Sequence, residues 1–109
     1  MVIDGISQST GVERLIDLSS AEAGVLLVIS DRAGAQEWVR LVLPAEELIA
    51  ILTDHPEGPQ AVVGMSGDEA RELKVEVRRN EVLLAVGESD AAVGLDDLMD
   101  ALASVLPAA

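Results

Sequence analysis

Two stretches decide the fold expected of this chain: VRLVLPAEELIAIL at residues 39–52 and AAVGLDDLMDALASVL at residues 91–106. In both, a short apolar run ends in a leucine, Leu43 or Leu95, and a helix-opening residue lies beside it. An acidic pair and apolar residues at helical spacing complete the pattern, which is typical of an amphipathic helix that follows a strand. The two stretches therefore predict two strand-to-helix corners.

Each predicted helix has its own start signal and its own core-facing stripe. Pro44 suits the first helical position, because the N–H that proline lacks would have no acceptor inside the helix. Asp96 is a good N-cap for the second helix. The apolar stripes consist of Ala45, Leu48, Ile49 and Leu52 in the first helix, and of Leu98, Ala101, Leu102, Val105 and Leu106 in the second.

Acidic side chains stand in the first turns of both helices: Glu46, Glu47, Asp96, Asp97 and Asp100. The exposed N–H groups of a helix start favour negative charge, so capping and solvation are a sufficient reason for these residues. Asp96 and Asp100 are four apart, as helical metal ligands would be, but the alternating oxygen ligands of a calcium loop are absent. We expect no metal site here and keep the five residues as candidates for an acidic face.

Apolar runs and alternating segments predict the strands. Residues 25–29 and 82–86 are apolar on both faces, which is typical of covered strands. Short turns are expected at Asp31–Gly34 and Arg79–Asn80, and residues 1–11 end in a polar loop. The expected strands are residues 12–18, 25–29, 37–43, 60–65, 72–78, 82–86 and 91–95.

The two halves of the chain resemble each other. VLLVISD at 25–31 matches VLLAVGE at 82–88 at an offset of 57, and the helices match at an offset of 50. Each half is expected to be strand–strand–strand–helix, with pseudo-repeats at 12–55 and 69–106 and a Pro/Gly connector near 56–59. A true duplication and a generic likeness of two strand–helix corners both fit this pattern.

These elements predict one α+β domain over residues 1–109, with a largely antiparallel sheet and two helices packed on one face. The chain has no cysteine, which excludes a disulfide framework and a thiolate zinc site. The N-terminus has neither a basic region nor an apolar stretch of signal-peptide length, so we expect a cytoplasmic protein.

The charge balance limits the possible partners. Twenty acidic residues face seven basic ones, for a formal net charge of −13, which opposes binding to phosphate backbones and anionic lipids. The order of elements is similar to that of single-stranded nucleic-acid-binding domains that wrap strands around a helix. Such domains need basic grooves and stacking aromatic side chains. This chain has no Phe, no Tyr and one Trp, so we expect no nucleic-acid partner and no membrane partner.

The remaining residues offer little for catalysis. His55 is the only histidine, and no motif gives it the positioned partner that general-base work needs. The G-x-x-G at residues 64–67 is followed by acids that would repel phosphate. The basic residues Arg71, Lys74, Arg78 and Arg79 fit a charged strand edge better than an anion site. We therefore expect no enzymatic activity and no cofactor.

Trp38 is the best functional lead in the sequence. It should lie with Arg40 and Val42 on the strand face opposite Val39, Leu41 and Leu43. An exposed Trp is an interface candidate, because Trp is enriched at binding hot spots, but Trp38 could equally cap the edge of the core. The expected function is a non-enzymatic protein–protein interaction module of the regulatory, inhibitor or chaperone-like kind, which also self-associates. The alternative is a small-ligand-binding or enzymatic domain with a pocket between sheet and helices.

Overall fold

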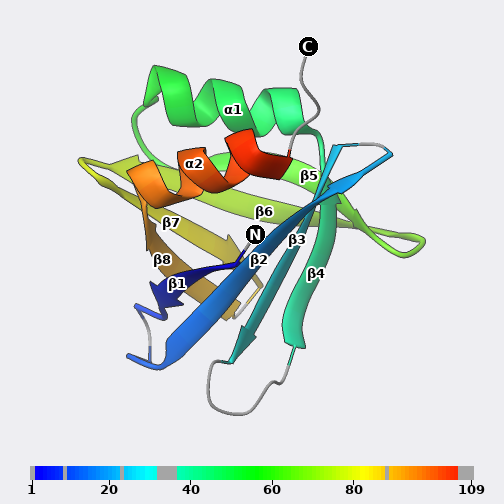
Figure 1. Ribbon diagram of the computed structural model, residues 1–109, viewed down its shortest axis with the longest axis horizontal. Helices are drawn as coiled ribbons and strands as arrows, with labels where there is room; N and C mark the ends of the chain where they lie inside the picture. The colour runs from blue at the N-terminus through cyan, green and yellow to red at the C-terminus, as the bar shows by residue number, and fades with distance from the viewer. Residues whose placement is uncertain (1, 9, 23, 32–36, 88, 106–109) are drawn as a thin grey trace.

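The computed structural model of the chain describes residues 2–8, 10–22, 24–31, 37–87 and 89–105, and for Glu37 and Trp38 the backbone alone. These residues form strands and helices in the order β1–β4, α1, β5–β8, α2 (Figure 1). The bounds are β1 Val2–Ile6, β2 Glu13–Ala21, β3 Gly24–Asp31, β4 Glu37–Leu43, α1 Ala45–Asp54, β5 Gln60–Ser66, β6 Glu69–Arg78, β7 Glu81–Val86, β8 Ser89–Gly94 and α2 Leu95–Val105.

The strands join in sequence order into one closed antiparallel barrel. β1–β4 and β5–β8 are two runs of antiparallel neighbours, and α1 carries the chain from the first run to the second. Two seams close the barrel, β4 against β5 and β8 against β1. Among the described residues, each seam has a single pair that faces across it, Val42–Met65 in one and Ile6–Ala92 in the other.

Aliphatic side chains fill the interior of the barrel. An eight-stranded barrel is just wide enough to be filled by its own side chains, so it needs no aromatic residues to form a core. Every second residue along the strands points inward and is buried: Ile16, Leu18, Val25, Leu27, Ile29, Val39, Leu41, Leu43, Val62, Leu73, Val75, Val82, Leu84, Val86, Ala91 and Val93.

Both helices lie across one end of the barrel (Figure 1). α1 contacts β3, β5 and β6, α2 contacts β1, β2 and β8, and the helices contact each other. The predicted stripes are confirmed where the chain is described: Leu48 and Leu52 of α1 and Leu98, Ala101 and Leu102 of α2 are buried with the barrel core. Each helix is therefore held by strands from both halves of the chain.

The helix ends differ in detail from the prediction. Pro44 is the N-cap of α1, one position before the helix, and Asp96 lies inside the first turn of α2 because that helix already begins at Leu95. His55 ends α1 in the left-handed conformation (φ 50°), and its N–H donates to Ile51 O at 3.1 Å. This is the capping geometry that usually takes glycine.

The predicted sheet is wrong in three respects. It closes into a barrel, so the helices cover an end of the barrel rather than one face of an open sheet. Each half has four strands before its helix, because residues 2–6, for which no strand is expected from the sequence, form β1 and pair with β2. The apolar strand β3 is not covered on both faces, since Leu26 and Val28 are half-buried on the outside. The predicted turn after Asp31 and the end of the second stripe at Leu106 lie outside the described residues.

Two glycines let the seams close. A Cβ on Gly5 would stand 2.6 Å from Ile16 Cδ1 and 2.9 Å from Ala92 O, and one on Gly64 would stand 2.7 Å from Leu43 Cδ2. Gly5 faces Arg14 across its hairpin as Gly64 faces Arg71, so the two glycines occupy matching places in the two halves.

No helix among the described residues is long and apolar enough to cross a membrane.

Candidate functional site

An apolar row crosses the outside of the barrel at the β4–β5 seam. Leu26 on β3 faces Val42 on β4, Val42 faces Met65 on β5, and Met65 faces Ala70 on β6. Leu43, which follows Val42, and Gly64, which precedes Met65, are buried, so the row itself points outward. Met65 is 44% exposed and Val63, two residues earlier on β5, is 58% exposed. We call Leu26, Val42, Val63, Met65 and Ala70 the seam face.

The seam face is unlike the strand beside it. The outward side chains of β6 from Glu72 to Arg78 are all charged, as expected of a strand face in water: Glu72, Lys74, Glu76 and Arg78. The outward side chains of β5 are Ala61, Val63 and Met65, all apolar and all exposed. Contiguous exposed apolar surface of this kind marks interaction sites on proteins.

The three predicted interface residues all lie on β4. Val42 is half-buried in the middle of the seam face, and Arg40, two residues before it, is exposed on the same outer side. Ile29 of β3 pairs with Val39, but the next residue, Ser30, pairs with Glu37. The pairing therefore skips Trp38, and β4 is irregular at that position. The side chain of Trp38 lies outside the described part of the chain, and its predicted role stays a prediction.

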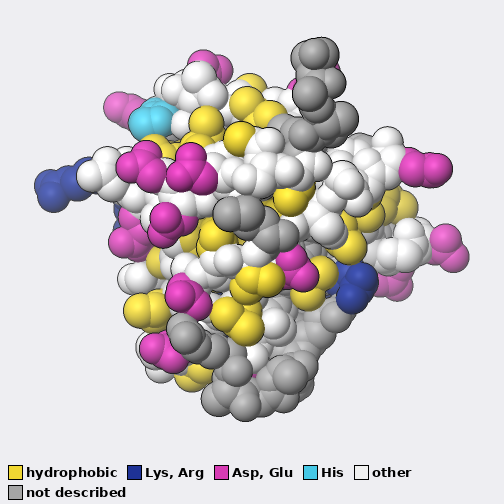
Figure 2. Space-filling model, viewed as in Figure 1, with side chains coloured by type: hydrophobic (Ala, Val, Ile, Leu, Met, Phe, Trp, Pro, Cys, Tyr) yellow, Lys and Arg dark blue, Asp and Glu magenta, His cyan; other side chains and the backbone are white. Residues whose placement is uncertain are grey.

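The predicted acidic residues lie on the helices and not on the seam face. Glu46 and Glu47 are exposed in the first turn of α1, and Asp96 and Asp97 are exposed in the first turn of α2. Asp100 is exposed one turn further along α2. Acidic side chains outnumber basic ones on the face that Figure 2 shows. The location of Glu46, Glu47, Asp96 and Asp97 fits the local reason already given for them, a helix start that favours negative charge, whereas Asp100 lies beyond the first turn.

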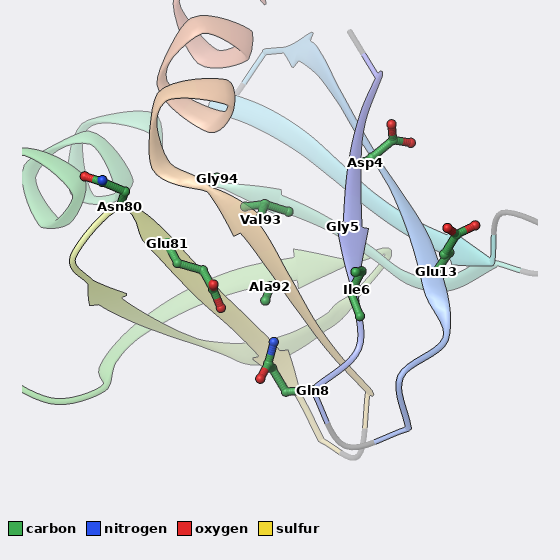
Figure 3. A pocket seen from close by; sticks show the side chains of 10 residues that line it. All are labelled: Asp4, Gly5, Ile6, Gln8, Glu13, Asn80, Glu81, Ala92, Val93 and Gly94. Carbon is green, nitrogen blue, oxygen red and sulfur yellow. The ribbon is translucent and has the colours of Figure 1, made fainter.

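A second surface feature lies at the other seam. A groove of about 390 Å³ runs over β8, between β7 on one side and β1 on the other (Figure 3). We call it the β8 groove. Its lining residues are Asp4, Gly5, Ile6, Gln8, Glu13, Asn80, Glu81, Ala92, Val93 and Gly94, and no lysine or arginine is among them.

The predicted basic cluster is divided by its neighbours. Arg78 is paired with Glu76 on the outer side of β6, and this carboxylate raises the pKa of the Arg78 guanidinium. Arg71 and Lys74 line a separate hollow of about 370 Å³, which is formed by β6 and β7 and also includes Glu72.

The β8 groove and this hollow are both lined by strand and turn residues. Neither is therefore the pocket between sheet and helices of the alternative prediction. His55 is exposed at the end of α1.

Two features are not predicted from the sequence: the exposed apolar side chains of β5, and the strand β1. The sequence predicts a short strand at residues 60–65, and alternation with the buried Val62 and Gly64 puts Val63 and Met65 on its outside. A signal for β1 was present: Gly5–Ser7 reads GIS and Gly64–Ser66 reads GMS, at an offset of 59.

The described residues contain no group of three or more His, Asp or Glu side chains placed to hold a metal ion. Comparison of the chain with protein-family models, curated proteins and solved structures found no match. The seam face and the β8 groove are therefore the features from which a function has to be argued.

Proposed function

We propose that this chain is a non-enzymatic protein–protein interaction module, and that its partner docks on the seam face. The single observation that carries this proposal is the exposure of Val63 and Met65, at 58% and 44%, beside the half-buried Val42. An outward strand face in contact with water alone would be polar, as β6 is. A partner that covers this row would remove its apolar surface from water, at roughly 25 cal/mol per Å².

The charge distribution supports a contact at this place. The chain has a net charge of −13, so another acidic protein, including a second copy, would be repelled at most positions on its surface. The residues that flank the seam face are of both signs: Glu72 and Lys74 on β6 and Arg40 on β4. The basic side chains among them reduce repulsion at this place, which supports self-association through this face as well as binding to a different protein.

The test replaces Met65 by aspartate and compares the variant with Val12→Asp. Val12 is the matched control, because it is also 44% exposed and lies on the β1–β2 connection. A charge in the centre of a covered apolar contact weakens association strongly, whereas a charge at a solvated position has little effect. The readouts are sedimentation velocity over a range of concentrations and affinity capture from the native lysate.

Met65→Asp should abolish self-association and partner capture while Val12→Asp leaves both unchanged. Thermal unfolding of both variants checks that the barrel remains folded. The predicted role of Trp38 is tested by Trp38→Ala, which should reduce the same association without unfolding the domain. A Met65→Asp protein that sediments and captures partners like the parent would overturn the proposal.

A further inference from the structure

The β8 groove exists because the last two outward residues of β8, Ala92 and Gly94, are small. Ala92 and Gly94 form its floor, while β7 and β1 carry larger side chains on either side. Within the part of the chain that the structure describes, β1 faces β8 at Ile6–Ala92 alone, so their backbone ladder is short. β8 ends at Gly94, where the chain enters α2, so β8 has no further residues that could pair with β1.

Two carboxylates stand on either side of the glycine in the floor. Glu81 on β7 faces Gly94 directly, and the Ile6–Ala92 register puts Asp4 on the β1 side of Gly94. The side chain of Asp97, at the start of α2, also stands beside Gly94, so a third carboxylate lies at this place. A cationic group above Gly94 would lie among these acidic side chains. Figure 3 shows the carboxylate of Asp4 pointing away from β8, so contact with it requires this exposed side chain to rotate towards the groove.

The next outward position along β8 is apolar. Leu83 on β7 faces Ala92, and Ala92 faces Ile6 on β1. Ile6 is 50% exposed, whereas Ala92 is only 7% exposed at the bottom of the groove. The groove therefore offers an acidic place over Gly94 and an apolar place over Ala92, two residues away along the strand.

We propose that the β8 groove binds an extended segment of a partner protein in which a basic residue is followed, two residues later, by an aliphatic one. Side chains on the same side of an extended peptide repeat at about 6.8 Å, which is also the spacing of Gly94 and Ala92 along β8. The basic residue lies between Asp4 and Glu81 in charge-assisted contacts. The aliphatic residue lies over Ala92, against Leu83 and Ile6.

Charge complementarity selects this occupant. Asp4, Glu13 and Glu81 line the groove, and residues 80–109 contain no lysine or arginine at all. The far end of the groove meets the start of α2, where Asp97 Oδ2 stands 3.1 Å from the place of a Cβ on Gly94. An acidic segment would be repelled along the whole groove. This inference is independent of the seam face, because the two surfaces share no residue.

The probe for the test is a fluorescein-labelled peptide, Gly-Ser-Arg-Thr-Leu-Ser-Gly amide, measured by fluorescence anisotropy at low ionic strength. Two charge-neutralised proteins are compared: Asp4→Asn with Glu81→Gln in the groove, and Glu69→Gln with Glu72→Gln on β6 outside it. Both pairs change the net charge equally, and Glu69 and Glu72 are exposed. The groove pair should weaken binding about tenfold or more, because both charge-assisted contacts to the basic residue are lost. The β6 pair should weaken it less than twofold.

Two further measurements separate site binding from general attraction between charges. Ala92→Leu fills the apolar place without changing any charge and should abolish binding, with circular dichroism to check the fold. A peptide with Arg and Leu adjacent, rather than two apart, should bind at least fivefold more weakly. The proposal is overturned if the probe does not bind saturably, if the two charge pairs weaken binding equally, or if Ala92→Leu in a folded protein binds like the parent. None of these results bears on self-association through the seam face.

Discussion

Ser7 Oγ donates a hydrogen bond of 2.7 Å to Asp90 Oδ1, which joins the β1–β2 connection to β8 across 83 positions of the chain. The second carboxylate oxygen of Asp90 accepts the N–H of Gln8 at 2.9 Å. Ser7 is fully buried. Because β1 and β8 share only one pair of facing residues, this carboxylate fastens the seam where the backbone ladder does not.

We expect Asp90→Ala to destabilise the barrel by about 2–4 kcal/mol, because it leaves the buried Ser7 hydroxyl without this acceptor and loosens the seam. Urea unfolding followed by circular dichroism measures the effect. Asp68→Ala is the control, since Asp68 is exposed in the β5–β6 turn, and it should change stability by less than about 0.5 kcal/mol. Equal stabilities of the two variants would show that the Ser7–Asp90 bond does not hold the seam.

Gly5→Ala and Gly64→Ala should each destabilise the protein by about 1–3 kcal/mol, because the added methyl group forces two seam strands apart. The closest atoms at both positions include a backbone oxygen, Ala92 O at 2.9 Å and Val42 O at 3.0 Å, and these cannot move aside without moving a strand. Gly94→Ala is the comparison, because its nearest atom belongs to the side chain of Asp97. Thermal unfolding should rank Gly94→Ala as the mildest of the three, and the reverse order would contradict the account of how the barrel closes.

Arg14 and Asp31 form an ion pair of 2.6 Å at neighbouring positions on β2 and β3. Arg14 is only 6% exposed, so removing its acidic partner leaves a buried charge. We expect Asp31→Ala to cost about 3 kcal/mol in urea unfolding. The double variant Arg14→Met with Asp31→Leu should recover most of that loss, because a matched apolar pair often replaces a buried ion pair without cost. A double variant that is less stable than Asp31→Ala would sink this interpretation.

His55→Gly should stabilise the protein by about 0.5–1 kcal/mol. His55 holds a positive φ of 50° at the end of α1, a conformation that glycine adopts without the steric cost of a Cβ. His55→Ala keeps the Cβ and serves as the control, with no gain expected. Thermal unfolding of the two variants distinguishes a histidine that is only tolerated at this place from one whose ring contributes to stability.

The elements with strong local signals could be predicted from the sequence. The limits of β4 and the stripe of α1 follow from alternation and helical spacing in residues 39–52, and Leu48 and Leu52 are buried as expected. The turn at Arg79 and Asn80 was also expected, although it is Arg79 that has positive φ. Local patterns of this kind are set by residues close together in the chain.

Closure of the barrel could not be predicted in the same way. It depends on two pairs of residues, Val42–Met65 and Ile6–Ala92, and the second pair joins opposite ends of the chain. β1 has only five residues, includes an aspartate and a glycine, and is followed by a polar loop, so its own sequence carries a weak strand signal. The sequence predicts a short strand at residues 91–95 but not the β8 groove, because the groove forms only where β1 and β7 lie on either side of the small residues of β8.

The most direct test of the central proposal places a photo-crosslinking amino acid at Val63 or at Val2 in the living source cells. Val63 and Val2 are 58% and 57% exposed, so the two positions differ in location and hardly at all in accessibility. If the seam face is a protein contact, irradiation should yield discrete adducts of greater mass from position 63 and none of those adducts from position 2. An adduct at twice 11.4 kDa would identify a second copy as the partner. Identical patterns from the two positions, or no discrete adduct from position 63, would contradict the account.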